Sequence, residues 1–134
     1  MEILLKTVTV FLILLLFASP ILIAFAIQKW NFSKNFILLI GVGLVVTFML
    51  VALIGWWAYF SNGILMSYYG YDFEAMNAID RFKNVTSDNL EAIKVLEANL
   101  LGVGWPLKVI LSYLFIVPII TLEYVAVYFL KIKR

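Results

Sequence analysis

Three long apolar runs dominate the pattern of hydrophobic and polar positions along this chain. Residues 7–27 and 36–60 contain no charged side chain, and residues 105–130 contain only Lys108 and Glu123. At about 1.5 Å of rise per residue, each run is long enough as a helix to cross a hydrocarbon core of about 30 Å. A signal peptide is the alternative for the first run, but that run exceeds the roughly 7–15 apolar residues of a signal sequence. The pattern predicts an all-α integral membrane protein with three transmembrane helices.

The segment between the second and third runs, residues 61–104, has an amphipathic pattern instead. Its first half repeats apolar residues at three-residue spacing among charged ones, which predicts a short amphipathic helix. The apolar stripe of this helix is Phe73, Met76, Ile79 and Phe82. A second helix is expected to begin with Asp88 as its N-cap and to end at Gly102. Its apolar stripe is Leu90, Ile93, Leu96 and Leu100. We expect both stripes to be buried against each other, the membrane surface or a partner protein.

Composition agrees with a membrane protein and limits its size. The 134 residues are 65% hydrophobic and 13% charged, whereas soluble domains average about 45–50% apolar and 25% charged residues. A separate soluble domain would need about 50 residues or more. We therefore predict one membrane domain over residues 1–134, in which residues 61–104 form an extracytoplasmic helical loop.

The distribution of charge predicts an orientation in the membrane. The first loop and the C-terminal tail carry basic and no acidic side chains, namely Lys29, Lys34, Lys131, Lys133 and Arg134. Segment 61–104 lies on the other side of the membrane and holds six acidic and three basic residues. Because basic loops stay in the cytoplasm, we predict an outside N-terminus and a cytoplasmic C-terminus in the plasma membrane. Lys6 argues weakly against this orientation and is partly balanced by Glu2.

The residue types that are missing exclude several kinds of chemistry. The chain has no His and no Cys, so haem ligation by either residue and cysteine zinc sites are impossible. Glycine loops that cradle phosphate and calcium motifs are absent as well. The basic residues are few and lie at membrane edges, which argues against nucleic-acid binding. We predict no enzyme activity, no catalytic residue, no metal and no cofactor.

A few residues inside the spans are candidates for a specific role. Glu123 lies about 12 Å inside one end of the third span, where a carboxylate either bonds a neighbour or serves as a proton or cation site. Gly43 and Thr47 form a small-residue pair suited to close helix packing, within the chain or with another copy. Lys108 and Ser112 resemble a hydrolase Ser–Lys pair only in spacing. Lys108 is expected to reach headgroups or an acid of segment 61–104.

These observations favour a non-catalytic structural or accessory subunit of a membrane assembly. The assembly is either a complex with other membrane subunits or copies of this chain in a self-assembling membrane or envelope protein. The expected partner-docking residues are Phe73, Met76, Phe82, Leu90, Ile93, Leu96 and Leu100. The alternative is an ion- or proton-coupled transport component that uses Glu123. The lipid bilayer is a partner in either case.

Overall fold

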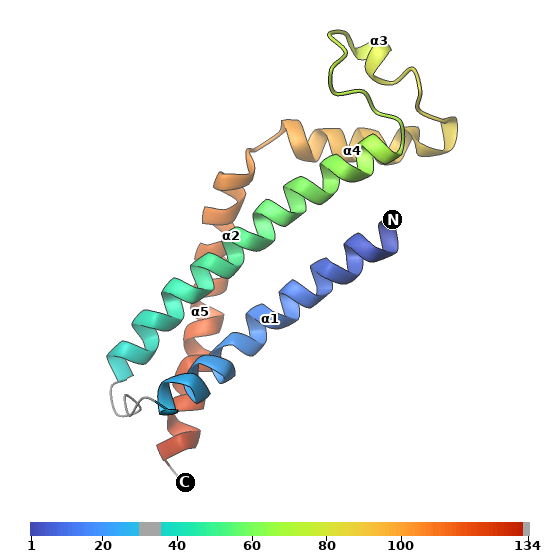
Figure 1. The fold of residues 1–134 in the computed structure, drawn as a ribbon. Coiled ribbons are helices and arrows are strands. Elements are labelled where there is room, and N and C mark those ends of the chain that lie inside the picture. Colours follow the sequence, from blue (N-terminus) through green and yellow to red (C-terminus); the bar gives the residue numbers. More distant parts are fainter. Residues whose placement is uncertain (30–35, 133–134) are drawn as a thin grey trace.

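The computed structural model describes residues 1–29 and 36–132, which contain helices and no strand. Helices α1 (Glu2–Lys29), α2 (Phe36–Tyr68) and α5 (Trp105–Ile132) are each long and apolar enough to cross a membrane. The beginning of α1 and the end of α5 lie at opposite ends of the three-helix bundle (Figure 1). The prediction of an all-α protein with three spans is confirmed, and it indicates a multi-pass membrane protein. Most of the predicted cytoplasmic loop and residues 133–134 lie outside the described residues.

Two of the helices extend well past the apolar runs from which they were predicted. Helix α2 has 33 residues, so it is about 50 Å long and exceeds a hydrocarbon core of about 30 Å. It ends just before Gly70, whose φ of 90° is a left-handed conformation that favours glycine. Helix α1 already begins at Glu2, whose carboxylate pairs with Lys6 one turn later at 2.6 Å. Hydropathy predicts which part of a helix lies in the bilayer. The helix itself continues until the backbone conformation changes, as it does for α2 at Gly70.

The three long helices pack on one another along two apolar clusters. One cluster joins Ala24 of α1 and Leu39 of α2 to Ile120 and Tyr124 of α5. The other joins Leu16, Val51 and Val109 from the same three helices, nearer to α4. Polar side chains add links between α1 and the upper part of α2. The Trp57 indole N–H donates to Thr9 Oγ1 at 3.2 Å, and the Tyr69 hydroxyl donates to Glu2 Oε2 at 3.3 Å.

Two prolines, Pro20 and Pro118, lie within continuous helices. Pro20 is fully buried in α1, and its ring nitrogen cannot donate to the carbonyl of Leu16 one turn earlier. The Ser19 hydroxyl donates to that carbonyl instead, at 2.7 Å. A neighbouring side chain thereby restores the hydrogen bond that proline removes, as hydrocarbon surroundings require. Pro118 lies within α5 at an exposed position.

The segment after α2 folds back onto the end of that helix. Helix α4 (Leu90–Leu101) lies across the end of α2, and α3 (Ala78–Arg81) lies beyond both of them (Figure 1). A third apolar cluster holds these elements together. Met66 of α2, Tyr71 of the loop and Ile93 of α4 form its buried centre, and Ile93 has no exposed surface at all. The amphipathic stripe of the second predicted helix is thus buried within the chain.

The prediction of an amphipathic helix through residues 73–82 is wrong. Only α3, a single turn, is helical there, because two side chains bond the backbone locally. Asp72 accepts a hydrogen bond from the Glu74 N–H at 2.9 Å, and Asn77 accepts one from the Asp80 N–H at 2.7 Å, capping the helix at that point. Such local bonds compete with helix formation, and a helix this short is not stable by itself in water.

The boundaries of the second predicted helix are half right. Its end at Gly102 is confirmed, since the Gly102 N–H bonds the Ala98 carbonyl at the C-cap of α4. Asp88 as the N-cap is wrong, because residues Ser87–Asn89 form a 3-10 turn, η1, that leads directly into α4. The cap position of that turn is Thr86, whose hydroxyl oxygen accepts a hydrogen bond from the side-chain amide of Asn89 at 3.1 Å.

Candidate functional site

Gly43 and Thr47 face α5 of the same chain. A side-chain carbon at Gly43 would overlap the ring of Tyr124, so only glycine allows the ring to lie against α2 at this point. Gly55 is in the same position against Val109, whereas Gly41 faces open space. The small residues of α2 therefore allow close packing between α2 and α5.

The Tyr124 side chain brings a polar group to the crossing of the three helices. Its hydroxyl lies near the hydroxyls of Ser19 on α1 and Thr47 on α2. Those two hydroxyls donate to the carbonyls of Leu16 and Gly43 in their own helices. By hydrogen-bond geometry the Tyr124 hydroxyl has no partner among the described residues, although the side chain has no exposed surface. The crossing is therefore apolar packing around a small group of hydroxyls.

Glu123 precedes Tyr124 in sequence but is not part of this crossing. Its side chain is half-buried on α5, and no hydrogen bond or ion pair forms to it within residues 1–29 and 36–132. The neighbouring Thr121 donates its hydroxyl to the Val117 carbonyl of its own helix at 2.7 Å. No second carboxylate is available in the apolar runs of α1 and α2. A relay of titrating groups through the three spans would therefore contain one member.

The residues predicted to dock a partner divide into two groups. Phe82, Ile93, Leu96 and Leu100 belong to the cluster that joins α4 to the end of α2, and Leu90 is half-buried. The other group is exposed, with Met76 at 100% and Phe73 at 50% of their full surface. Ile79, which shares their loop, is 84% exposed. We call Phe73, Met76 and Ile79 the outer tip.

Backbone hydrogen bonds close the loop that carries the outer tip. The Asp72 N–H donates to the Arg81 carbonyl at 3.1 Å, and the Arg81 Nε donates to the Ala75 carbonyl at 3.0 Å. The Phe73 ring packs edge-on against Tyr71, with centroids 4.9 Å apart. The base of the loop is thus fixed to the apolar cluster, and the tip side chains are held outward.

Tyr71 also connects the loop to α4 through a polar contact. Its hydroxyl donates to the Glu97 carboxylate at 2.6 Å. Burial raises the pKa of Tyr71, and the hydrogen bond to Glu97 acts in the same direction. The phenol therefore stays a neutral donor at ordinary pH, and the loop remains bonded to α4.

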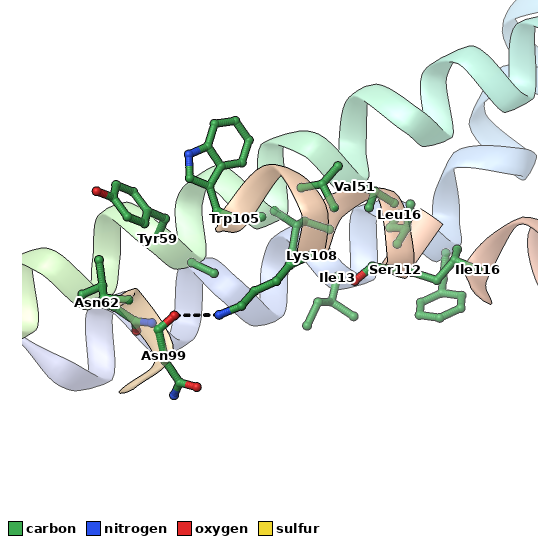
Figure 2. A pocket seen from close by; sticks show the side chains of 16 residues that line it. Ile13, Leu16, Val51, Tyr59, Asn62, Asn99, Trp105, Lys108, Ser112 and Ile116 are labelled. Atoms are coloured by element: carbon green, nitrogen blue, oxygen red, sulfur yellow. Dashed lines mark hydrogen bonds between the residues drawn. The ribbon is translucent and has the colours of Figure 1, made fainter. Parts of the chain in front are cut away.

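A cavity of about 460 Å³ lies between α1, α2 and α5 at the end near α4. Apolar side chains line most of it, among them Leu16, Val51 and Ile116. Lys108 lies at its polar end, where its ammonium donates to the Asn99 carbonyl of α4 at 2.6 Å (Figure 2). The sequence suggested headgroups or an acid of segment 61–104 as partners of Lys108. The structure shows a backbone carbonyl of that segment in place of an acid. Ser112 lines the same cavity one turn further along α5.

Sequence patterns did not predict this cavity or the role of Tyr124. Both depend on which faces of three nearly uniform apolar helices meet. The lysine at the start of the third span was the one detectable sign of the cavity, and the glycine at position 43 was the sign of the crossing. Neither residue identifies its partner by spacing alone.

Comparisons with known proteins add no functional assignment. No protein-family model, no curated protein and no solved structure matches this chain. In the part of the chain that the structure describes, no group of three or more acidic side chains is arranged to hold a metal ion.

The Gly43 contact predicts a sharp difference between two glycines of α2. Gly43→Ala should lower the free energy of unfolding by about 1–3 kcal/mol, because the new methyl group overlaps the Tyr124 ring. Gly41→Ala adds the same group in open space and should leave stability unchanged. Unfolding of both variants in mixed micelles with increasing SDS measures the difference. Equal stability of the two variants would show that α2 and α5 do not meet at Gly43.

Proposed function

We propose that this chain is a non-catalytic structural or accessory subunit of a membrane protein assembly, bound to its partner through the outer tip. The observation that carries the proposal is the exposure of Phe73, Met76 and Ile79 on a loop closed by hydrogen bonds. Large apolar side chains exposed on one short loop favour association with another protein. The partner is either a different membrane subunit or a further copy of this chain.

The position of the outer tip favours a protein partner over lipid. Helix α4 lies across the end of α2, and the loop with α3 lies on the far side of α4 from the spans (Figure 1). Tyr68 is eight residues, or about 12 Å, beyond the predicted end of the second span at residue 60. With the end of the second span at residue 60, as the sequence predicts, the tip lies beyond the hydrocarbon core.

The non-catalytic part of the proposal rests on how the polar side chains are used. The sequence has no His or Cys to act as base, nucleophile or soft metal ligand. Several hydroxyls in the spans donate to carbonyls of their own helix, including those of Thr7, Thr47 and Thr121. Hydroxyls bonded in this way satisfy their own hydrogen-bonding capacity within the helix, as hydrocarbon surroundings require.

Removing the apolar side chains of the tip should release the partner. We expect Met76→Ser with Ile79→Ser to reduce assembly strongly while the chain still inserts and folds, because both side chains are exposed and outside the apolar cluster. The control is Lys83→Ser with Asp88→Ser, two exposed positions of the same segment that leave net charge unchanged. Photocrosslinking at position 76 in native membranes, followed by mass measurement of the product, identifies the partner.

Two results would contradict docking through the tip. One is a wild-type chain that stays monomeric in mild detergent and gives no crosslink from position 76. The other is an assembly that both double variants weaken equally. A crosslinked product of twice the mass of the chain would instead identify a second copy as the partner.

The alternative function, ion- or proton-coupled transport, is favoured by one observation only. Glu123 is an intramembrane acid with no hydrogen-bond partner in the described part of the chain. Acids in such positions often mark ion or proton pathways. A single acid in a bundle of three spanning helices would need further subunits to complete a pathway.

Exchange of Glu123 for glutamine separates the two functions. If the residue is structural, Glu123→Gln should leave assembly and activity of the parent complex within about twofold of wild type, because Gln keeps the shape and the hydrogen-bonding capacity. Reconstituted vesicles with an internal pH dye measure proton flux, and Glu123→Leu serves as the apolar comparison. Flux in wild type that disappears in a fully assembled Glu123→Gln protein would support transport and contradict the accessory role.

We further propose that the N-terminus and segment 61–104 face the outside of the plasma membrane and that the C-terminus is cytoplasmic. The support is the basic character of the first loop and the C-terminal tail. A cysteine at the exposed position Ser87 should react with a membrane-impermeant reagent in intact cells, and one at Lys133 should react only after permeabilisation. The opposite labelling pattern would reverse the orientation.

A further inference from the structure

The cavity beside Lys108 changes from polar to apolar along its length. Its lining on α5 runs from Trp105 to Ile116, which is about 16 Å of helix. Figure 2 shows Asn62 and Asn99 at the end toward which the Lys108 ammonium points, with Leu16 and Ile116 toward the other end. Its volume of about 460 Å³ lies within the roughly 300–1,000 Å³ of small-molecule sites. A molecule that matches this lining has one polar end and one long apolar part.

The cation at the polar end has hydrogen-bonding capacity left over. An ammonium carries three donors, and Lys108 uses one of them for the Asn99 carbonyl. No carboxylate pairs with it among residues 1–29 and 36–132, where the ion pair that forms is Lys6 with Glu2. The Asn99 carbonyl belongs to the last turn of α4, where backbone carbonyls attract a cation and so hold the ammonium in place. An anionic group at this end would complete the partners of Lys108.

The apolar part of the cavity lies along helices whose exposed side chains meet hydrocarbon when the helices cross a bilayer. Helices α1 and α5 diverge toward their ends near α4 (Figure 1), and side chains of both helices and of α2 line the cavity there. Three of the lining side chains on α1 and α5, Ile13, Phe17 and Ser112, are exposed. An acyl chain that enters from the hydrocarbon reaches the apolar end directly. Tyr59 and Trp105 lie toward the polar end, as is typical of aromatic residues at headgroup level (Figure 2).

We propose that this cavity binds an anionic phospholipid from the bilayer leaflet next to α4, with its phosphate at Lys108 and one acyl chain along α5. The length of the lining supports this occupant, because about 16 Å is close to half of a hydrocarbon core of about 30 Å, the depth of one leaflet. The charge supports it as well, since no carboxylate of residues 1–29 and 36–132 pairs with the Lys108 ammonium, which therefore attracts the phosphate of a lipid that carries no cation of its own. This lipid site is independent of the outer tip and of the role proposed for the chain.

The test uses the full chain in phosphatidylcholine nanodiscs that contain a small fraction of a photoreactive lipid. One probe is phosphatidylglycerol and the other is phosphatidylcholine, each with the reactive group on an acyl chain. Mass spectrometry of the crosslinked peptides maps the labelled residues. In wild type, the anionic probe should label residues 13–17 and 105–116 about tenfold more than the zwitterionic probe, as expected for a charge-assisted contact.

Variants at Lys108 assign that preference to the ammonium. Lys108→Gln should reduce labelling by the anionic probe to the level of the zwitterionic probe, and Lys108→Arg should keep the preference because it keeps the charge. The matched control is Lys94→Gln, which removes an exposed ammonium of α4 outside the cavity. Ser112→Phe should fill the cavity and reduce labelling by both probes. Circular dichroism and size-exclusion profiles of each variant verify that the chain is folded.

Three results would overturn the lipid site. The first is equal labelling of residues 105–116 by both probes in wild type, which indicates ordinary surrounding lipid. The second is an equal loss in Lys108→Gln and Lys94→Gln, which indicates a general effect of charge. The third is labelling by a photoreactive free fatty acid at concentrations where the phospholipid probe labels nothing, which would make a free fatty acid the occupant.

Discussion

The length of α2 relative to the bilayer is the constraint on which the rest of this structure depends. In hydrocarbon every backbone N–H and C=O must be bonded within the chain, so an apolar run that crosses the membrane has to be helical. Nothing in α2 stops the helix at the bilayer edge, and it continues to Tyr68 before Gly70 turns the chain. The projecting end supplies Met66, against which the segment between the spans folds.

That projecting end explains how a segment of about 35 residues is ordered without a domain of its own. Ile93 and Tyr71 are buried on Met66, and the Tyr71 hydroxyl bonds Glu97. Membrane-anchored α2 thus provides one wall of a small core that a free segment of this size could not complete. With the stripe of α4 used inside the chain, the apolar side chains of the outer tip remain available to another molecule.

The close approach of α2 and α5 determines the shape of the three-helix part of the molecule. Tyr124 against Gly43 and Val109 against Gly55 keep these two helices together along much of their length. Helix α1 joins them at Ala24 and separates from α5 toward α4. The space left between α1 and α5 is the cavity, and Lys108 closes its polar end by bonding α4. One lysine thus links the extramembrane helix, the third span and the proposed lipid site.

The sequence by itself determined the class of protein, the three spans and the existence of α4 with its end at Gly102, because charge-free runs and a regular apolar stripe leave few alternatives in hydrocarbon or at its surface. It could not determine helix ends beyond the bilayer or the structure of residues 73–82, where local hydrogen bonds of Asp72 and Asn77 prevail over an apolar spacing. Only the tertiary structure decided that Gly43 packs within the chain, that Ile93 is buried while Met76 is exposed, and that Lys108 meets a carbonyl beside a cavity. The reason is that apolar helices look alike on every face, so the choice of touching faces depends on shape complementarity between residues far apart in the chain.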